Sequence, residues 1–378
     1  MKILVWLSGW VDSAVAAHLL MKEGHEIVAG FMLNYLDEDN PNCTTKLDLE
    51  SFHAVRKHLG IEAYEIFDYR TEYEDRILNY IYQWYQQGIT PNPDVYCNSL
   101  VKFDLFRKEA IAMGFDAIAT GHYARITQTP SALPHPPSQG EYSTKWVYHL
   151  LKWIDNTKDQ SYFLSQLDQT QLSQAIFPLW GMDKSEVRKL AHHIWLPNAD
   201  RPDSQGLCFV GNISMQDFLM DKIWPKPGII IDLEWKQVGA HNGAYLYTIG
   251  QRRNLYLPFQ SYVADVNVTD NIVTVARVWQ ENALLTKQIT MVHPHRISWS
   301  APVTWSYTCK IRYRQEAQNC MLELVEHSWE LVDWDSYELW SMTYKLIFDE
   351  PIIWVANGQI VVIYDGDEVV GSWVIQKN

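Results

Sequence analysis

The sequence predicts an α/β protein with a doubly wound parallel-sheet domain, a small central domain and a C-terminal antiparallel β-barrel. Over the first 205 residues, short apolar runs alternate with helical patterns, which is typical of a parallel sheet. From Gly228 onward the runs are short, alternating and bounded by turn residues, which indicates antiparallel strands. The chain has 378 residues, more than one typical domain holds. We expect domains over residues 1–207, 208–277 and 278–378.

In the first domain we expect each strand to be followed by a helix. The apolar run at residues 2–7 predicts a strand, and AVAAHLLMKEG predicts a helix with Gly24 as its C-terminal cap. Further strands are expected over 26–33, 61–68 and 116–120, and helices over 51–60 and 100–114. Parallel sheets of this kind bind ligands at the carboxyl ends of their strands.

The second half predicts mainly β-structure. Strands are expected within 228–232, 244–250, 261–278 and 308–314. The C-terminal segment GQIVVIYDGDEVVGSWVI contains Asp365-Gly366, a pair that favours a hairpin turn. The segment TPSALPHPPSQG, residues 129–140, is expected to be a proline-rich surface loop.

Composition narrows the class of protein. Apolar residues make up 47% of the chain and charged residues 20%, so a large core can form. No apolar run is long enough to span a membrane and no signal peptide is evident, so we expect a cytoplasmic protein without a membrane partner. A net charge of −14 argues against indiscriminate polyanion binding but allows a local basic face. The five scattered cysteines fit neither a disulfide framework nor the usual spacing of a zinc site.

The motif SGWVDS, residues 8–13, follows the first expected strand and opens a helix. Backbone N–H groups at such a helix N-terminus bind anions. The motif has neither the Gly-Lys-Ser/Thr ending of a Walker A loop nor a dinucleotide fingerprint. It resembles the SGGxDS motif of the PP-loop ATP pyrophosphatases, which cleave ATP between the α- and β-phosphates. The simpler alternative is an ordinary helix capped by Asp12 or Ser13.

Seven further motifs extend this resemblance over nearly the whole chain. They are, in order, GITPNPDVYCNSLVKF, ATGHYAR, KDQSYFL, FPLWGM, DSQGLCF, GAYLYTIGQR and KIRYRQ. Together they resemble the tRNA-specific 2-thiouridylase family, which thiolates the wobble uridine (position 34) of tRNA. The resemblance implies a PP-loop (HUP-like) domain that uses ATP and Mg²⁺, and tRNAs with Lys, Glu and Gln type anticodons. It also implies a sulfur donor, either a cysteine desulfurase or a relay protein.

The resemblance places ATP at the phosphate loop and at two positions beyond it. The loop residues are Leu7, Ser8, Gly9, Trp10, Val11, Asp12 and Ser13. Met32 is expected at the adenine and Gly121 beside the nucleotide, and Asp12 is the expected Mg²⁺ ligand. The plain alternatives are a core methionine for Met32 and a turn glycine for Gly121.

Sulfur insertion at neutral pH needs a thiolate or a persulfide as nucleophile. By resemblance, Cys208 carries a persulfide that attacks C2 of the adenylated uridine. Cys97 then attacks the persulfide, which leaves a Cys97–Cys208 disulfide for a reductant to reopen. Release of hydrogen sulfide as the attacking species is an alternative in the same scheme. We expect Cys43, Cys309 and Cys320 to be small buried hydrophobic residues.

The remaining motif residues are tRNA contacts by resemblance. Asn92, Pro93 and Asp94 are expected to frame a pocket for the extruded uridine, with Asp94 acting on the edge of the base. The other expected contacts are His122, Lys158, Asp159, Gln160, Arg312, Tyr313 and Gln359. The plain alternatives are a simple turn for Asn-Pro-Asp and solvated loops for the others.

Tryptophan is frequent in this chain and glycine is scarce. There are 17 Trp and 18 Gly, whereas an average glycine content of about 7% predicts about 26. Six tryptophans stand where the motifs lead us to expect glycine: Trp10, Trp153, Trp180, Trp195, Trp235 and Trp373. Trp6 and Trp354 stand where Gly or Ala is usual. We hypothesise that one codon, for example UGA, is read as glycine in the source organism.

If Trp10 is genuine, its indole is expected to fill the phosphate site. The chain would then be a catalytically silent tRNA-binding homologue. A third alternative is another PP-loop enzyme, such as an amidotransferase, whose activity would not depend on Cys97 or Cys208.

Overall fold

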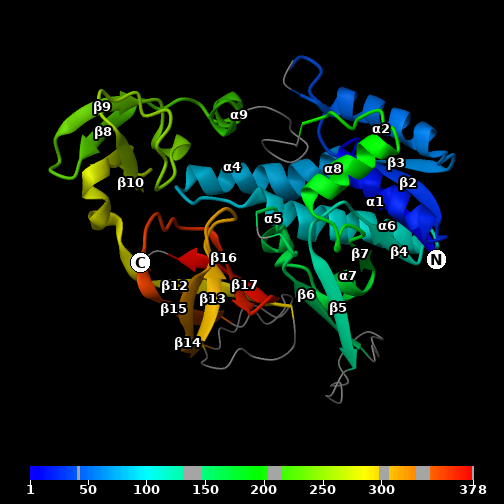
Figure 1. The fold of residues 1–378 in the computed structure, drawn as a ribbon. Helices are drawn as coiled ribbons and strands as arrows, with labels where there is room; N and C mark the ends of the chain where they lie inside the picture. Colours follow the sequence, from blue (N-terminus) through cyan, green and yellow to red (C-terminus); the bar gives the residue numbers. More distant parts are fainter. Residues whose placement is uncertain are drawn as a thin grey trace, which may run out of the picture.

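The computed structural model describes residues 1–40, 43–130, 146–155, 157–202, 214–297, 306–328 and 341–376. Over these residues the chain forms three parts (Figure 1): an N-terminal part around a parallel sheet, a small central part, and a C-terminal barrel. The predicted fold class is therefore confirmed.

The N-terminal part is built on a parallel sheet with the strand order β3-β2-β1-β4-β7. Its strands are β1 (Lys2–Trp6), β2 (Glu26–Leu33), β3 (Tyr64–Asp68), β4 (Ala117–Ala119) and β7 (Ala175–Ile176). The order reverses at β1, because β2 and β3 lie on one side of it and β4 and β7 on the other. In such a sheet the ligand crevice opens beyond the carboxyl ends of the strands at the reversal, here β1 and β4.

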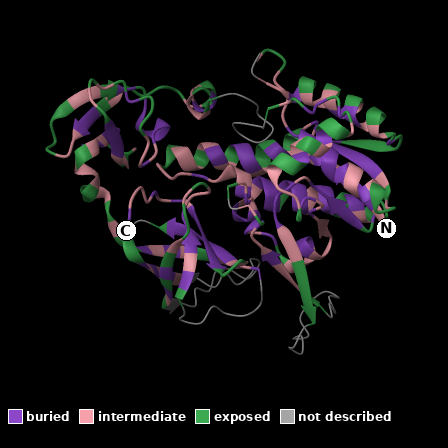
Figure 2. Cartoon of the chain, in the orientation of Figure 1, coloured by how far each residue is buried: buried purple, intermediate pink, exposed green. Residues whose placement is uncertain are grey.

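Helices cover both faces of this sheet, so its inner strands β1 and β2 are almost continuously apolar and largely buried, whereas the edge strand β3 is mostly exposed (Figure 2). On β1, Ile3 and Val5 enter one core while Leu4 enters the other. The first core is completed by α1 (Val11–Lys22), α2 (Thr45–Leu59) and α8 (Lys184–His193). The second is completed by α3 (Arg70–Tyr73), the π-helix η1 (Glu74–Leu78), α4 (Asn79–Gln86), α5 (Pro93–Cys97), the π-helix η2 (Asn98–Phe106) and α6 (Arg107–Ala112).

Most expected elements of this part are present. Helix α1 ends as predicted, with Gly24 left-handed at φ +83. The helix expected over 100–114 is instead π-helical up to Phe106 and α-helical only afterwards. The helical stretch over residues 70–86 was not indicated by the sequence.

The central part holds a four-stranded sheet in the order β10-β11-β8-β9, in which β8 and β11 are parallel. Its elements are α9 (Met215–Lys222), β8 (Gly228–Asp232), β9 (Gln237–His241), the 3₁₀ turn η4 (Ala244–Leu246), β10 (Ser261–Asn267), β11 (Ile272–Arg277) and the 3₁₀ helix η5 (Val278–Leu284). The strand expected over 244–250 is wrong. Gly243 (φ +153) and Gly250 (φ +84) turn the chain at both ends of that segment.

The C-terminal part is an antiparallel barrel, in which the strand order β12-β15-β14-β13-β16-β17 closes through a β12–β17 pairing. The strands are β12 (Thr286–Arg296), β13 (Ser306–Lys310), β14 (Gln318–Ser328), β15 (Ser341–Ile352), β16 (Ile360–Asp365) and β17 (Glu368–Gln376). The predicted hairpin at Asp365-Gly366 joins β16 to β17.

A hairpin of the N-terminal part extends the barrel sheet. It consists of β5 (Arg125–Pro130) and β6 (Trp146–Leu151), and β6 pairs with β17. The 3₁₀ helix η3 (Ser161–Leu164) and α7 (Gln169–Ser173) follow it. Most of the expected proline-rich loop, residues 131–140, lies outside the described residues.

The segment after β6 fixes the barrel to the N-terminal part. Asp159 is only 1% exposed. Its carboxylate accepts hydrogen bonds from the backbone N–H groups of Trp153 (3.0 Å) and Ser161 (3.1 Å) and from the Ser161 hydroxyl (2.9 Å). The next residue, Tyr162, donates its hydroxyl hydrogen to the carbonyl of Ile360 in the barrel at 2.8 Å. A buried carboxylate thus shapes the segment on which the barrel rests.

We predict that Asp159→Ala lowers the free energy of unfolding by about 2–4 kcal/mol, because it leaves buried N–H groups without an acceptor. Asp155→Ala is the matched control, since the side chain of Asp155 binds Thr157 at an exposed turn, and it should cost less than about 1 kcal/mol. Urea unfolding followed by tryptophan fluorescence compares the two variants. Equal effects would show that Asp159 has no special structural role.

Candidate active site

The phosphate loop lies between β1 and α1, as predicted. Gly9 has φ +80, and a Cβ on it would lie 2.4 Å from the carbonyl oxygen of Asp48, so no other residue fits. The carbonyl oxygen of Gly9 accepts hydrogen bonds from Ser51 (2.6 Å), Asn198 (2.9 Å) and Arg201 (3.1 Å). Because the peptide unit is planar and trans, the N–H of the next residue points away from these three donors.

The N-terminus of α1 has the features of an anion site. Its N-cap residue is Trp10, in extended conformation, and no side chain caps the helix. The first N–H groups of a helix have no acceptor within it, and the helix dipole favours negative charge there. Ser13 instead braces the loop, because its Oγ accepts from the N–H of Ser8 and donates to the carbonyl of Trp10. The alternative of a helix capped by Asp12 or Ser13 is therefore wrong, and the loop suits a polyphosphate such as that of ATP.

Asp12 is held by two protein donors. The Nζ of Lys184 lies 2.7 and 2.8 Å from its two carboxylate oxygens, and the hydroxyl of Tyr123 donates to the first at 2.6 Å. No cluster of three or more metal-ligating side chains occurs in the described part of the chain. Coordination of Mg²⁺ by Asp12 would therefore require Lys184 to move away from this carboxylate.

The other residues assigned to ATP are mostly buried. Leu7 and Val11 lie in one core, and Met32, at the end of β2, lies in the other at 1% exposure. A Cβ on Gly121 would lie 2.6 Å from the backbone nitrogen of Ser13. The missing side chain of Gly121 thus lets the loop after β4 close directly against the first turn of α1.

Trp10 is half-buried beside the loop. Its backbone is extended rather than left-handed, with φ −96. Its indole ring lies 3.7 Å from the Cζ of Arg201, the residue that also binds the Gly9 carbonyl and the carboxylate of Asp48. The indole thus covers a guanidinium, a group well suited to binding phosphate.

A pocket of about 390 Å³ opens where the three parts of the chain meet. It is lined by Pro91, Asn92, Pro93, Asp94, Tyr162, Phe163, Met215, Arg312, Tyr313 and Gln359. Six of these were expected to contact tRNA: Asn92, Pro93, Asp94, Arg312, Tyr313 and Gln359. The structure thus brings together residues from the N-terminal part and the barrel that lie far apart in the sequence. Sequence reasoning missed Tyr162 and Phe163, although both stand in the KDQSYFL motif, and it had no signal for Met215.

The pocket wall is held by hydrogen bonds between the three parts. Asn92 caps α5 by accepting from the N–H of Val95 at 3.4 Å, and its amide nitrogen lies 3.4 Å from the hydroxyl of Tyr162. Arg312 donates from one nitrogen to the carbonyls of Ile249 and Trp354, both at 2.8 Å. Burial lowers the pKa of Arg312. Arg312 therefore joins the central part to the barrel as well as lining the pocket.

Aromatic rings face this pocket. The ring centroids of Phe163 and Tyr313 lie 4.3 Å apart, and both side chains line the pocket. Unpaired bases are commonly bound by stacking on such side chains. The pocket therefore has the chemical character of a site for a single extruded base.

Four expected tRNA contacts lie outside this pocket. Asp159 is internal, as described above, and Gln160 accepts a hydrogen bond from the N–H of Tyr123 through its side chain. His122 is buried and lies 2.7 Å from the hydroxyl of Thr120. Burial, followed by the nearby charge of Lys102, lowers its pKa well below the usual range. Lys158 is half-buried.

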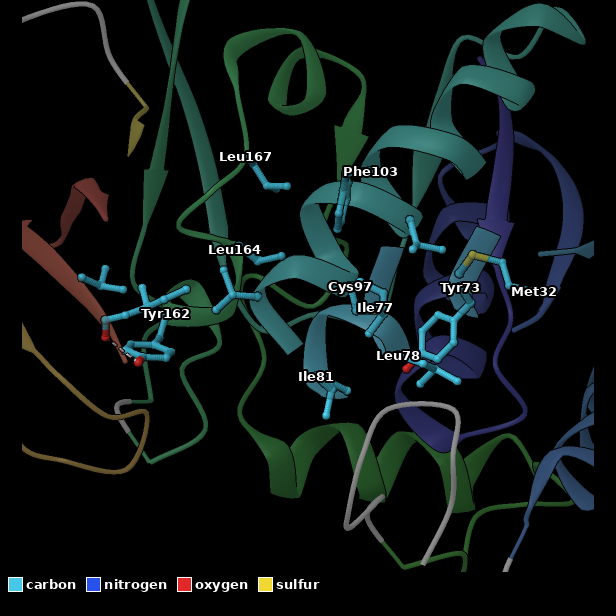
Figure 3. Packing of buried hydrophobic residues seen from close by; sticks show 14 of the residues in the cluster. Met32, Tyr73, Ile77, Leu78, Ile81, Cys97, Phe103, Tyr162, Leu164 and Leu167 are labelled. Atoms are coloured by element: carbon cyan, nitrogen blue, oxygen red, sulfur yellow. Dashed lines mark hydrogen bonds between the residues drawn. The ribbon is translucent and has the colours of Figure 1, made fainter. Parts of the chain in front are cut away.

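The expected sulfur-transfer pair is described only in part. Cys97 is the last residue of α5 and is 1% exposed, packed in the core close to Ile77 (Figure 3). Cys208 lies outside the described residues, so the Cys97–Cys208 pair is not placed. Cys309 and Cys320 are buried in the barrel, as expected. Cys43 is only half-buried and donates to the hydroxyl of Thr45, so the expectation of a buried hydrophobic residue is wrong there.

No helix in the described part of the chain is long and apolar enough to cross a membrane.

Three family descriptions match consecutive stretches of the chain. They are "tRNA methyl transferase HUP domain" over residues 1–212, "tRNA methyl transferase PRC-barrel domain" over 216–277 and "Aminomethyltransferase beta-barrel domain" over 286–375. A solved 4-thiouridine synthetase–RNA complex with bound ATP is 17% identical. That match covers 56% of this chain and 45% of the other, with a TM-score of 0.34.

Full-length relatives are much closer in sequence. The tRNA-specific 2-thiouridylase MnmA of Thiobacillus denitrificans is 39% identical over 99% of both chains. The protein of the same name from Neisseria meningitidis serogroup B is 37% identical over 99% of this chain and 95% of its own length. With this identity over its full length, the chain belongs to the tRNA-specific 2-thiouridylase family, ATP-dependent sulfurtransferases that act on tRNA.

Proposed function

We propose that the chain thiolates C2 of the wobble uridine, position 34, of tRNA through the pocket at α5. One observation carries the proposal. Helix α5 begins at the pocket wall with Pro93 and Asp94 and ends with Cys97. Residues three apart on a helix lie on the same side of it, so Cys97 and the pocket-lining Asp94 share one side of α5.

The chemistry follows from what must leave the uridine and what must attack it. The C2 oxygen becomes a leaving group when ATP adenylates it and pyrophosphate departs. Sulfur from a Cys208 persulfide then attacks C2 and AMP leaves. Cys97 then attacks the sulfur of Cys208 and breaks its bond to the transferred sulfur, which stays on C2. The Cys97–Cys208 disulfide that results needs an external reductant. In a variant of this scheme, hydrogen sulfide is released from the persulfide and attacks C2, and the products are the same.

Asp94 has a position suited to proton transfer. Its carboxylate lines the pocket beside the aromatic pair Phe163 and Tyr313. A base stacked on these rings would present its Watson–Crick edge to the polar wall of the pocket. Asp94 is then the group that acts on that edge, while Asn92, Arg312 and Gln359 hold the nucleotide.

Cys97 requires a rearrangement in this scheme. At 1% exposure its thiol cannot meet a second sulfur in the conformation described. A side chain in a tightly packed core becomes accessible only when the segments packed around it move. The proposal therefore includes a shift of α5, or of the segments packed on it, during sulfur transfer.

The proposal also covers the remaining partners. Asp12 would hold Mg²⁺, which would supply positive charge for the phosphates of ATP, and the sulfur donor is a cysteine desulfurase or a relay protein. The substrates are tRNAs with Lys, Glu and Gln type anticodons. The surface that faces the tRNA includes Lys158 and is supported from behind by residues of the same motifs, which are His122, Asp159 and Gln160. The enzyme acts in the cytoplasm, with domains at 1–207, 208–277 and 278–378.

Trp10 favours a second candidate, a silent tRNA-binding homologue. An indole at the N-cap of α1 stands at the place where phosphates approach backbone N–H groups. ATP–pyrophosphate exchange in the presence of cognate tRNA separates the two candidates. The silent homologue binds tRNA without exchange, whereas the enzyme shows both.

We predict that Cys97→Ser and Cys208→Ser each reduce thiolation by roughly 10³-fold or more, as expected when a nucleophile is removed. Cys43→Ser is the control, because Cys43 is half-buried and outside the scheme. Mass spectrometry of tRNA nucleosides measures the 2-thiouridine. Normal thiolation by either variant would remove the sulfur-transfer assignment and favour a different PP-loop chemistry.

We predict that Asp94→Asn lowers the rate of thiolation by about 10²-fold, the usual contribution of an acid–base group, with little change in tRNA affinity. The control is Asp75→Asn, an exposed residue of η1. Single-turnover kinetics give the rate, and filter binding gives the affinity. A loss of affinity that accounts for the whole effect would make Asp94 a binding residue instead.

A further inference from the structure

The ion pair between Lys184 and Asp12 joins α8 to the phosphate loop across 172 positions of sequence. Both side chains are mostly buried, with 16% and 28% of their surface exposed. The Nζ of Lys184 also lies 5.3 Å from the ring centroid of Tyr123. The scheme described above assigns Lys184 no role, although its ammonium group reaches the first turn of α1.

The backbone of Lys184 is held in place because this residue begins α8. It is the first residue of the helix, directly after the N-cap Asp183, whose carboxylate accepts from the N–H of Glu186 at 2.8 Å. Only the side chain of Lys184 can therefore be redirected. A lysine has a flexible four-carbon stem and three N–H donors, so it can exchange one anionic partner for another nearby.

Charge makes such an exchange favourable. A carboxylate next to the anion site would by itself repel the phosphates of ATP. When Lys184 turns from the carboxylate to a phosphate oxygen, Asp12 keeps its 2.6 Å hydrogen bond from Tyr123 and becomes able to face a cation. The second cation at the loop, Arg201, is already engaged by Asp48 and by the Gly9 carbonyl.

We propose that Lys184 is a phosphate-binding residue of the ATP site, held by Asp12 until the nucleotide arrives. The inference rests on the proposed ATP-dependent function and extends it to a residue outside the loop motif. Lys184 neutralises Asp12 while the site is empty and donates to the phosphates when ATP is bound.

Equilibrium binding of ATP and of inorganic pyrophosphate, measured by titration calorimetry, tests the proposal. Lys184→Gln should weaken both by about tenfold or more, as expected for loss of a charge-assisted hydrogen bond, and Lys184→Arg should retain part of the affinity. Lys189→Gln, an exposed position on the same helix, should bind like the wild type. Unchanged affinity in Lys184→Gln overturns the proposal.

A double-mutant comparison separates phosphate binding from mere neutralisation of Asp12. If Lys184 touches phosphate, Lys184→Gln still weakens binding in an Asp12→Asn background. If Lys184 only neutralises Asp12, it has no effect there, and the proposal fails. If Lys184→Gln does not fold, chemical acetylation of the wild type is measured instead. ATP should then protect Lys184 from acetylation, and equal acetylation with and without ATP overturns the proposal. A wild type that binds no ATP at all contradicts the proposed function itself.

A second inference comes from the backbone at three tryptophans. Seven non-glycine residues in the described part of the chain have positive φ, and three of them are Trp195 (φ +57), Trp235 (φ +63) and Trp354 (φ +63). A left-handed backbone is unfavourable for a bulky side chain, and glycine adopts it without that cost.

Trp195 occupies a glycine position at the end of α8. Its N–H donates to the carbonyl of His192, and the N–H of Leu196 donates to the carbonyl of Ala191. These two bonds define the Schellman motif, in which the left-handed residue after the cap is usually glycine. The side chain of Trp195 is 82% exposed, so burial does not compensate for the strain.

Trp235 also occupies a position typical of glycine, in the hairpin between β8 and β9. Its N–H donates to the carbonyl of Asp232, and Asp232 in turn donates to the carbonyl of Lys236. A turn followed by one left-handed residue favours glycine there. The indole is 81% exposed. Trp354 is half-buried instead. Its indole Nε1 is buried without a hydrogen-bond partner among the described residues, and its Cβ lies only 2.6 Å from where a Cβ on Gly250 would be.

We infer that the native chain carries glycine at Trp195, Trp235 and Trp354, because their shared codon is decoded as glycine in the organism that makes the protein. The same decoding would account for Trp10, Trp153, Trp180 and Trp373, which have ordinary φ values here. It would also uncover Arg201 at the phosphate loop.

Peptide mass spectrometry of the protein from its native cells tests this inference. The peptides should be lighter by one indole-methyl group at each site, and the gene should carry one non-standard codon at all three positions. Tryptophan masses with ordinary UGG codons overturn it. In the recombinant chain, Trp195→Gly should raise the melting temperature, whereas Trp224→Gly should not, since Trp224 is 90% exposed but has no positive φ. Equal shifts in the two variants would show that the left-handed backbone is not strained.

Discussion

The loop between β1 and α1 depends on the carbonyl oxygen of Gly9. Its three donors, Ser51, Asn198 and Arg201, come from α2 and from the segment after α8. Since the peptide unit is rigid, holding this oxygen also directs the following N–H and sets the start of α1. A side chain at Gly9 would collide with the backbone of Asp48 and push α2 away from the loop. One peptide orientation therefore links the loop to α2, to the segment after α8 and to the first turn of α1.

The pocket at α5 depends on a different constraint, the position of the barrel against the N-terminal part. Asp159 folds the segment after β6 around its carboxylate, and Tyr162 joins that segment to Ile360 and lies next to Asn92. Gln160 links the same segment to Tyr123, whose hydroxyl binds Asp12 at the phosphate loop. Residues of the KDQSYFL motif thus hold both the wall of the pocket at α5 and, through Tyr123, the loop at the start of α1.

Several residues chosen from motifs have structural positions that their residue type did not reveal. Asp159 and His122 read as polar surface groups but are buried, and Arg312 joins two domains through backbone carbonyls. A charged side chain in a motif is equally consistent with a ligand contact and with an internal hydrogen bond. Only the packing of distant segments around it distinguishes the two. The same holds for residues 244–250, where apolar alternation suggested a strand but two glycines turn the chain.

By itself the sequence determined the family, the order of the three parts, the loop between β1 and α1 and six of the residues that line the pocket at α5. These follow from local patterns, because hydrophobic periodicity and turn residues act over a few positions. The tertiary structure alone decided that Phe163 and Met215 complete the pocket, that Lys184 holds Asp12, and that Cys97 is buried. Such facts depend on contacts between segments that are distant in the sequence, and burial is a property of the packed whole rather than of any short stretch.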